Sequence, residues 1–310
     1  MSKILVLGEV MLDYYTYGVV ERINPEAPVP VIEVKREEYT LGGAGNVAKN
    51  LVGLKENPIL VSICNHDEAG IKIRELARNL GIDTYFINDS RPTIVKHRFI
   101  ALGYNQQLLR VDKEERTPLS REHADRILEK ISEINPEIIV ISDYGKGLIT
   151  PYLMDKLKQI YKGKILVDPK PKNIKNYRNV YLIKPNMKEA RMILGEEIIN
   201  ENQEVGRAAR KIMEKYSANI VITRGDKGAT LATLKGEIYH LKAKARQVHD
   251  VSGAGDTFIA TLTYAIKNGY SLKQAVELAN KAASIVVGKL GTVAITREEL
   301  EENEDILSEE

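Results

Sequence analysis

Short runs of β-branched residues alternate with segments of helical periodicity along most of this chain. The runs that predict buried strands cover residues 4–7, 59–63, 138–141, 165–167, 180–183 and 220–223. Between them, apolar residues recur at helical spacing over residues 44–54, 71–80, 121–134, 151–161 and 203–216. Strand and helix in turn favour parallel pairing with a helix in each crossover. The sequence therefore predicts an α/β fold of three layers, a doubly wound, mostly parallel sheet with helices on both faces.

Two segments interrupt this alternation. Residues 14–34 and 93–111 contain alternating apolar residues without a helical segment beside them. They are predicted to be antiparallel strands, which fit poorly into a doubly wound sheet. We expect insertions at about 14–36 and 92–112 to form a small β-sheet lid on a single domain spanning residues 1–310. Because an exposed strand edge invites pairing, we also expect a homodimer through this lid.

Charge balance and cysteine content exclude several classes of protein. The 310 residues carry 45 Lys and Arg against 43 Asp and Glu, a formal net charge of +2, so no overall field favours nucleic acid or an anionic membrane. Cys64 is the only cysteine, which excludes a disulfide framework, and the five histidines lack metal-ligand spacing. No apolar run approaches the roughly 18 residues that predict a membrane span. We expect a cytoplasmic protein that binds small molecules.

The sequence DVSGAGDTF at residues 250–258 combines small residues, a carboxylate and the start of an apolar helical segment. Gly253, Ala254 and Gly255 can direct consecutive backbone N–H groups at one point, and a helix beginning near Asp256 would add its positive end. Such a cradle suits phosphate oxygens. A carboxylate beside a bound phosphate suits the deprotonation of an attacking hydroxyl, so Asp256 is the candidate general base. The alternative is an ordinary helix N-cap at Ser252 or Asp256.

A second glycine-rich stretch, Gly42 to Asn46, precedes the helical segment 47–54. Residues 43–48 match the dinucleotide pattern G-x-G-x-x-A, with Asp67 at the distance of a ribose-binding acid. That pattern should follow the first strand of the sheet, however, and here it follows a polar run. The other interpretation is that Gly42, Gly43 and Asn46 line a sugar, with the Asn46 amide offering a donor and an acceptor.

Three aspartates follow predicted strands, where open α/β sheets bind their ligands. Asp13 lies shortly after the first strand, and its carboxylate could accept two hydroxyl protons of a diol. Asp143 and Asp168 follow later strands in the same way. Each could be a turn or cap residue, but three at one sheet edge favour a pocket lining.

Asn186 and Glu189 have N-x-x-E spacing after the strand 180–183, which fits water-mediated Mg²⁺ binding and equally a capping box. Residues 223–228, TRGDKG, fit either a hairpin loop or a wall of a nucleotide site. No G-x-x-x-x-G-K-[ST] pattern and no counterpart of the protein-kinase motifs occurs, so P-loop kinases and protein kinases are excluded.

Taken together, residues 250–256 and 42–46 closely resemble the signatures of the ribokinase-like carbohydrate kinases, D-T-x-G-A-G-D and G-G-x-x-x-N. The resemblance covers about residues 3–297 and implies ATP as phosphoryl donor, Mg²⁺ and often a monovalent cation such as K⁺. It implies that Asp256 is the base and that Gly253, Ala254 and Gly255 hold the transferred phosphoryl group. The implied Mg-ATP residues are Asn186, Met187, Lys188 and Glu189, the nucleotide contacts Thr223, Gly225 and Gly228, the adenine walls Asn280, Ala283 and Val287, and the monovalent-cation residues Asp250 and Ser252.

Within these kinases, RINPEAPVP at 22–30, QQLLRVD at 106–112 and SDYGKG at 142–147 resemble the bacterial D-glycero-β-D-manno-heptose 7-phosphate kinases. The resemblance implies phosphorylation of O1 on the route to lipopolysaccharide core sugar. The chain carries no nucleotidyltransferase H-x-G-H motif, so we expect a stand-alone kinase. The alternatives are a kinase for ribose, a fructose phosphate or a nucleoside, and a non-catalytic sugar-phosphate sensor. The cations proposed for the substrate phosphate are Arg22, Lys96, Arg98, Arg110 and Lys170.

Overall fold

The computed structural model describes residues 3–103, 106–243, 253–289 and 293–302, and two sheets organise this part of the chain. The larger sheet has the strand order β13-β12-β11-β10-β9-β8-β1-β4-β5. Its strands are β1 (Ile4–Gly8), β4 (Pro58–Ile63), β5 (Asp83–Ile87), β8 (Ile138–Ser142), β9 (Lys164–Asp168), β10 (Leu182–Ile183), β11 (Asn219–Thr223), β12 (Ala229–Ala232) and β13 (Ile238–Leu241). Strands from β11 to β5 in this order run parallel, and β12 and β13 are antiparallel.

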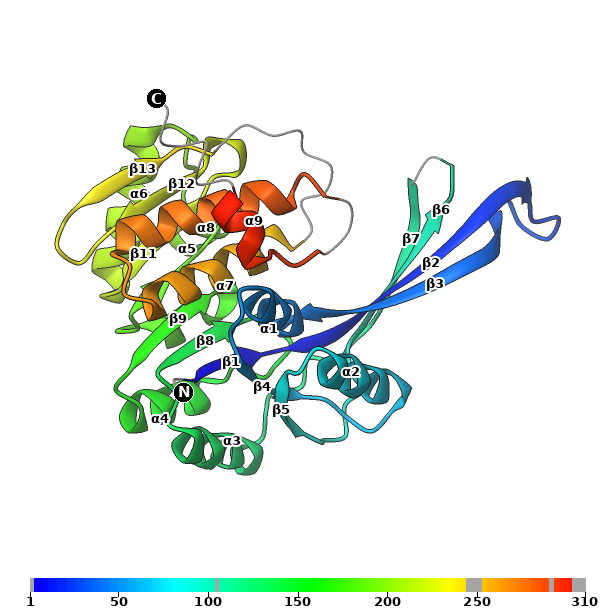
Figure 1. Cartoon of the computed structure of the whole chain (residues 1–310), viewed down its shortest axis with the longest axis horizontal. Coiled ribbons are helices and arrows are strands. Elements are labelled where there is room, and N and C mark those ends of the chain that lie inside the picture. The colour runs from blue at the N-terminus through cyan, green and yellow to red at the C-terminus, as the bar shows by residue number, and fades with distance from the viewer. Residues whose placement is uncertain (1–2, 104–105, 244–252, 290–292, 303–310) are drawn as a thin grey trace.

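Helices cover both faces of this sheet, as the alternation predicted (Figure 1). One face packs against α1 (Ala44–Gly53), α2 (Glu68–Asn79), α7 (Ala254–Lys267) and α8 (Leu272–Val286). The other packs against α3 (Arg121–Ile134), α4 (Pro151–Ile160), α5 (Met187–Leu194) and α6 (Asn202–Tyr216), and α9 (Arg297–Glu302) lies against α8. Buried strands such as Ile4–Gly8 contribute alternate residues to the two cores, which is why they read as continuous apolar runs.

The second sheet projects from the body and has the order β3-β2-β6-β7 (Figure 1). Its strands are β2 (Val10–Ile23), β3 (Pro30–Gly43), β6 (Val95–Ala101) and β7 (Gln106–Lys113). The predicted lid thus exists, but its first pair of strands begins and ends closer to the body than residues 14–36. The expectation of purely antiparallel strands was wrong, because β2 and β6 pair in parallel. We call these four strands the lid sheet.

Some predicted boundaries differ for local reasons. The strand expected at 180–183 is shortened to β10, since Asn179 just before it turns the chain with φ of 63°. The helix expected at 71–80 begins earlier, at Glu68, because the Asp67 side chain accepts a hydrogen bond from the Gly70 amide and caps it. Two short 3₁₀ helices, η1 (Pro171–Tyr177) and η2 (Gly225–Lys227), complete the elements. Within the described ranges, no helix has the length and apolarity to cross a bilayer.

Candidate active site

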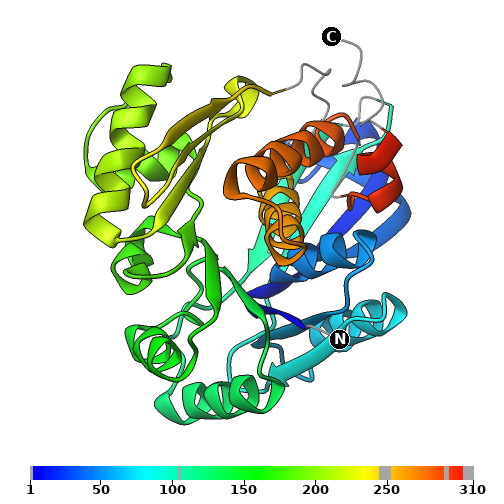
Figure 2. The ribbon, with the colours of Figure 1, turned by 60° about the vertical axis from the view of Figure 1, so that its left-hand side comes forward.

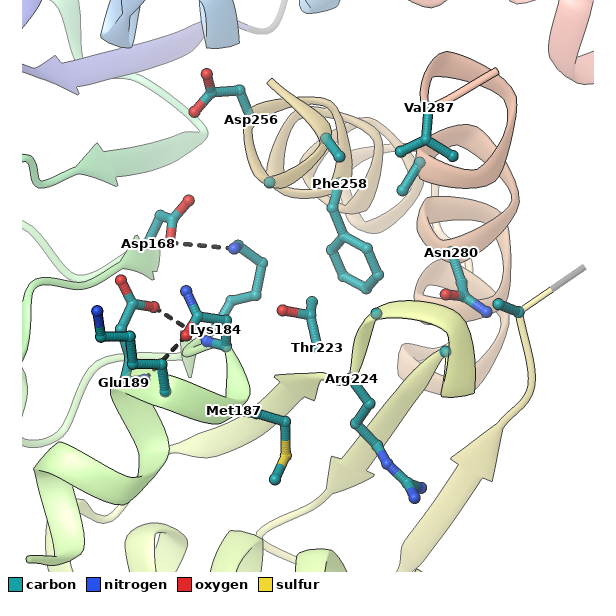
Figure 3. A pocket seen from close by; sticks show the side chains of 18 of the residues that line it. Asp168, Lys184, Met187, Glu189, Thr223, Arg224, Asp256, Phe258, Asn280 and Val287 are labelled. Carbon is teal, nitrogen blue, oxygen red and sulfur yellow. Dashed lines mark hydrogen bonds and ion pairs between the residues drawn. The ribbon is translucent and has the colours of Figure 1, made fainter. Parts of the chain in front are cut away.

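A cleft of about 880 Å³ lies at the carboxyl edge of the large sheet, between the loops after β8 to β11, the first turn of α7 and the last turns of α8 (Figure 3). Figure 2 shows the ribbon of α7 and α8, in orange, beside the yellow strands β12 and β13. Parallel strands place their following loops at this edge, which explains why residues distant in sequence meet there. The sequence-predicted residues that line the cleft are Asp143, Lys170, Asn186, Met187, Lys188, Glu189, Thr223, Gly225, Gly228, Gly253, Ala254, Gly255, Asp256, Asn280, Ala283 and Val287.

The first turn of α7 forms one wall of this cleft. Gly253 adopts the left-handed conformation with φ of 81°, and the helix begins at Ala254, two residues before the expected start. The amides of Ala254, Gly255 and Asp256 belong to the first turn, where N–H groups have no intrahelical acceptor. Asp256 is therefore inside the helix and is not its N-cap, and Gly253 caps without a side-chain bond. Asp250 and Ser252, the residues implied for a monovalent cation, lie outside the described residues.

Asp256 is 7% exposed and faces the cleft. Its Oδ2 accepts a hydrogen bond from Asn46 Nδ2 at 2.9 Å, and its Oδ1 accepts one from the Tyr144 hydroxyl at 2.7 Å. Burial raises the pKa of Asp256, whereas these two donors and the Lys184 ammonium lower it. A carboxylate with a raised pKa is a better proton acceptor, as a general base requires.

Lys184 and Asp168 form an ion pair beside the first turn of α7. Lys184 is 3% exposed, and its Nζ lies 3.1 Å from Oδ1 of Asp168 (Figure 3). A Cβ atom added to Gly255 would lie 3.6 Å from this Nζ, so the ammonium and the cradle are neighbours. Burial, partly offset by Lys184, raises the pKa of Asp168 to about 6. Lys184 was not among the predicted site residues, although its position directly after the strand at the sheet edge is a signal of the same kind as those of Asp143 and Asp168.

Asn186 and Glu189 form the capping box of α5. Asn186 Oδ1 accepts from the Glu189 amide at 2.9 Å, and Glu189 Oε2 accepts from the Asn186 amide at 3.0 Å. Glu189 Oε1 lies 3.1 Å from Lys170 Nζ. The capping interpretation is thus correct. Glu189 of this capping box and its partner Lys170 also line the cleft.

The far end of the cleft is apolar. Figure 3 shows Phe258 of α7 facing the space beside Val287, with Asn280 of α8 at its margin. The Asn280 Nδ2 donates to the Lys242 carbonyl at 2.8 Å, which fixes the amide. Residues Thr223 to Gly228 connect the antiparallel strands β11 and β12, so the hairpin interpretation is correct. Thr223, Gly225 and Gly228 also line the cleft, and their contact with a nucleotide stays a prediction.

The predicted sugar residues gather next to the cleft, on the lid sheet and α1. Asp13 on β2 is 6% exposed, and its Oδ1 accepts from Arg98 Nη1 of β6 at 2.6 Å. A Cβ on Gly42 would lie 2.2 Å from Asp13 Oδ2, so a larger residue at that position would displace the Asp13 carboxylate. Lys96 of β6 pairs in register with Asp13. Its Nζ lies 5.5 Å from the Tyr144 ring centroid, which joins this group to the cleft.

The dinucleotide interpretation of residues 43–48 is wrong. Gly43 ends β3 of the lid sheet, so α1 does not follow a strand of the parallel sheet as that fingerprint requires. Asp67, its expected ribose ligand, instead accepts from the amides of Gly70 and Thr93 at 2.9 Å each. This carboxylate is a helix cap.

Asp143 is held by the chain itself. Its Oδ1 accepts from the Gly145 amide at 2.7 Å, and its Oδ2 accepts from the Tyr177 hydroxyl at 2.5 Å and the Lys170 amide at 3.1 Å. Asn173 Nδ2 also donates to it. The turn interpretation weighed for this aspartate therefore holds, and its contact with a substrate stays a prediction.

Comparison with known proteins agrees with this geometry. Residues 1–299 match the pfkB family carbohydrate kinase model. The bifunctional protein HldE of a Nitratiruptor species is 39% identical over 305 residues, a match that includes 97% of this chain and 65% of that protein. The bifunctional protein HldE of Pseudomonas aeruginosa is 42% identical over 305 residues, a match that includes 96% of this chain and 63% of that protein. The chain therefore spans about two thirds or less of these relatives.

Solved structures share the fold. Phosphofructokinase-2 from Escherichia coli superposes with a TM-score of 0.85 at 20% identity, over 99% of this chain and 100% of that one. Ribokinase from Thermotoga maritima gives 0.78 at 23% identity, over 98% and 100%. The fold is ribokinase-like, with the large sheet and the smaller lid sheet in both comparisons. By its family match and its site, this chain is a member of the pfkB family of carbohydrate kinases.

Proposed function

We propose that this sugar kinase transfers the γ-phosphoryl group of ATP to O1 of D-glycero-β-D-manno-heptose 7-phosphate, giving the 1,7-bisphosphate used for lipopolysaccharide core precursors. The observation that carries the proposal is the position of Asp256. Its carboxylate lines the cleft and accepts a hydrogen bond from Asn46 of α1. Asp13 and the basic residues of β6 belong to the lid sheet and lie outside the cleft lining. The similarity to HldE and the heptose-kinase motifs support the choice of sugar.

A cluster of cations supports an acceptor that already carries phosphate. Lys96 and Arg98 lie on β6 in register with Asp13 and Tyr15 of β2. Burial lowers the pKa of Lys96, and the positive charges of Arg110, Lys146 and Arg98 lower it further, while Asp13 raises it. Arg98, Arg110 and Lys146 form ion pairs with Asp13, Asp112 and Glu114, so among the described residues the group keeps one positive charge in excess, that of Lys96, which favours an anionic ligand. A neutral sugar would not use this surplus.

The cleft fits ATP and Mg²⁺ by the chemistry of its lining. Its apolar end, with Phe258 and Val287, suits a base, and its polar end, with Lys184, Lys170 and the first-turn amides of α7, suits phosphates. Over the described ranges, no three His, Cys, Asp or Glu side chains are grouped to hold a metal ion. Glu189 and Asn186, the N-x-x-E pair, line the cleft and would hold Mg²⁺ through water. When bound, Mg-ATP supplies the phosphoryl group and neutralises part of its charge.

The chain's own residues account for the remaining chemistry. Asp256 accepts the proton of O1 as that oxygen forms its bond to phosphorus and the bond to the ADP oxygen breaks. The amides of Ala254 and Gly255 donate to the transferring group, and the Lys184 ammonium balances the negative charge beside them. Asp13 holds sugar hydroxyls and so orients O1. A monovalent cation at Asp250 and Ser252, the homodimer through the lid sheet and a cytoplasmic location stay parts of this proposal.

Coupled measurement of ADP release tests the choice of acceptor. The panel is heptose 7-phosphate, heptose, ribose, fructose 1-phosphate, fructose 6-phosphate and a nucleoside, each with Mg-ATP. The proposal requires the highest kcat/KM with heptose 7-phosphate and a loss of at least 100-fold with unphosphorylated heptose. The double variant Lys96→Gln, Arg98→Gln should remove most of this preference for the phosphorylated sugar. Higher kcat/KM with another sugar would replace the proposed substrate, and absence of ADP with every acceptor would favour a sensor.

A further inference from the structure

Tyr144 donates to the candidate base, a contact that has no role in the proposed phosphoryl transfer. Its hydroxyl lies 2.7 Å from Asp256 Oδ1, on the oxygen opposite to the one bonded to Asn46. The terminal torsion of an aspartate is soft, so a single partner leaves the carboxylate free to turn. Donors on both oxygens fix its plane. Each oxygen still has a lone pair for an acceptor hydroxyl.

The Tyr144 ring lies between the two halves of the site. Lys96 of β6 and Lys170 after β9 place their ammonium groups 5.5 Å and 5.6 Å from the ring centroid. Burial and the negative charges of Asp256 and Asp168 raise the pKa of Tyr144 well above its usual range, so the phenol stays a donor. It is thus a fixed, neutral donor at the junction of the acceptor side and the cleft.

The loop that carries Tyr144 is itself held by Glu9. This residue follows β1, is 4% exposed, and its Oε2 accepts from the Tyr144 amide at 2.8 Å. Its Oε1 accepts from the amides of Lys146 at 2.9 Å and Leu148 at 3.3 Å. Gly145 and Gly147 have φ of 68° and 99°, which allows the loop to turn these amides inward around one carboxylate.

Glu9 also connects to the second donor of Asp256. The Glu9 carbonyl accepts from the Ala44 amide at 3.0 Å, at the first residue of α1, and α1 carries Asn46. A Cβ on Gly43 would lie 2.4 Å from the same carbonyl, so the contact requires glycine there. The side chain of Glu9 therefore anchors the Tyr144 loop, and its backbone anchors the start of α1.

From this arrangement we propose that Tyr144 is a positioning residue that orients the Asp256 carboxylate, and that Glu9 acts through it as the buried anchor of its loop. The inference rests on the proposed role of Asp256 as the base. A misplacement of about 1 Å can cost on the order of 100-fold in rate, so an orienting donor matters to turnover.

The variants Tyr144→Phe and Glu9→Gln test the proposal, with Tyr152→Phe as the matched control. Tyr152 donates to Asp125 at 2.7 Å on the surface of α4, so its variant loses the same kind of bond far from the site. We expect Tyr144→Phe to lower kcat about 10-fold and to change the KM for ATP by less than about 2-fold. Its acid limb in the kcat profile should move to higher pH, because a donor to the ionised carboxylate is lost.

Non-additivity separates the role of Glu9 from a general loss of structure. If Glu9 acts through Tyr144, then Glu9→Gln lowers kcat in the parent chain and adds little loss to Tyr144→Phe. Equal effects of Glu9→Gln in both backgrounds would overturn this part of the proposal. Thermal unfolding of each variant shows whether it is folded. If Glu9→Gln does not fold, the proposal is tested with Tyr144→Phe, which keeps the aromatic ring.

A readout without turnover keeps the inference distinct from the proposed function. The Asp256 carboxyl carbon can be titrated by ¹³C NMR in the parent chain and in Tyr144→Phe, with Asp256→Asn for assignment. Asp13, Lys49, Asp168 and Lys184 face Asp256 in both proteins, so a difference belongs to the phenol. We expect the pKa of Asp256 to rise by about one unit in Tyr144→Phe. An unmoved pKa with unchanged kcat overturns the inference, whether or not heptose 7-phosphate is the substrate.

Discussion

Asn46 Nδ2 lies 2.9 Å from Oδ2 of Asp256, a hydrogen bond between residues 210 positions apart. It joins α1, which follows strand β3 of the lid sheet, to the first turn of α7. The two helices also pack against each other, with Thr257 Oγ1 donating to Asn50 Oδ1 at 2.9 Å. Asp256, the proposed base, is therefore held by α1 and by the loop after β8.

Asp256→Asn should lower kcat by about 10²- to 10⁴-fold, the usual contribution of a general base. The amide keeps the size of the side chain but cannot accept the acceptor's proton. ATP affinity, measured by calorimetry, should stay within about 2-fold, since the cleft lining is otherwise intact. Turnover at the parent rate in a coupled ADP assay would remove Asp256 from its role.

Lys184→Met should lower kcat/KM for ATP by about 10- to 100-fold, corresponding to about 1.4–2.7 kcal/mol for a lost charged hydrogen bond. The variant removes the ammonium beside Gly255 and leaves Asp168 without its cation. The matched control is Lys211→Met, which breaks an exposed pair with Glu196 on the surface of α6. Steady-state kinetics with ATP varied checks both; equal effects in the two variants would contradict the assignment.

Gly42→Ala should raise the KM for the acceptor by about 10- to 100-fold through displacement of the Asp13 carboxylate. The added methyl group would meet Asp13 Oδ2 at 2.2 Å and the Met11 side chain at 2.9 Å, so Asp13 must move. The KM for ATP is the internal control and should be unchanged, because neither residue lines the cleft. A normal acceptor KM would show that Asp13 does not hold the sugar.

The contribution of Glu9 and Asp168 to the stability of the ligand-free protein should fall as the pH rises from about 4.5 to 7. Burial, and then the charge of Asp143, raises the pKa of Glu9 from 4.5 to about 7, and burial raises the pKa of Asp168 to about 6. In this window these two carboxyl groups bind more protons in the folded state than in the unfolded state, so their titration favours unfolding as the pH rises. Burial lowers the pKa of His97 and His240, which acts in the opposite direction. Urea unfolding at several pH values measures the slope. Glu9→Gln should flatten it, and an equally steep slope in that variant would contradict the assignment to Glu9.

The local motifs predicted much of the site, because their residues are neighbours in sequence at one helix start or strand end. Gly253 to Asp256, Asn186 to Glu189, and Thr223, Gly225 and Gly228 lie together along the cleft, and their roles stay predictions. Glu9 and Tyr144 were not predicted as site residues, because their contacts join residues 135 and 112 positions apart in the sequence. Only the pairing of β1 with β8 brings Glu9 to the Tyr144 loop.

The fold shows the same division. Alternating runs predicted the parallel sheet and both helical layers, since period and length are local properties. The parallel pairing of β2 with β6 was missed, because strand partners in the lid sheet are set by the path of the chain through β4, α2 and β5. The capping box at Asn186 was one of the two interpretations of the N-x-x-E spacing, and Asp67, expected as a ribose ligand, caps α2.

The lid sheet carries Asp13, Lys96 and Arg98, whereas every residue proposed for ATP belongs to the large sheet's loops and to α5, α7 and α8. In the proposed function, the donor and the acceptor are thus recognised by separate segments of the chain that meet at Asp256. Substitutions on β2 and β6 would then change the sugar that the enzyme selects and leave its ATP site intact.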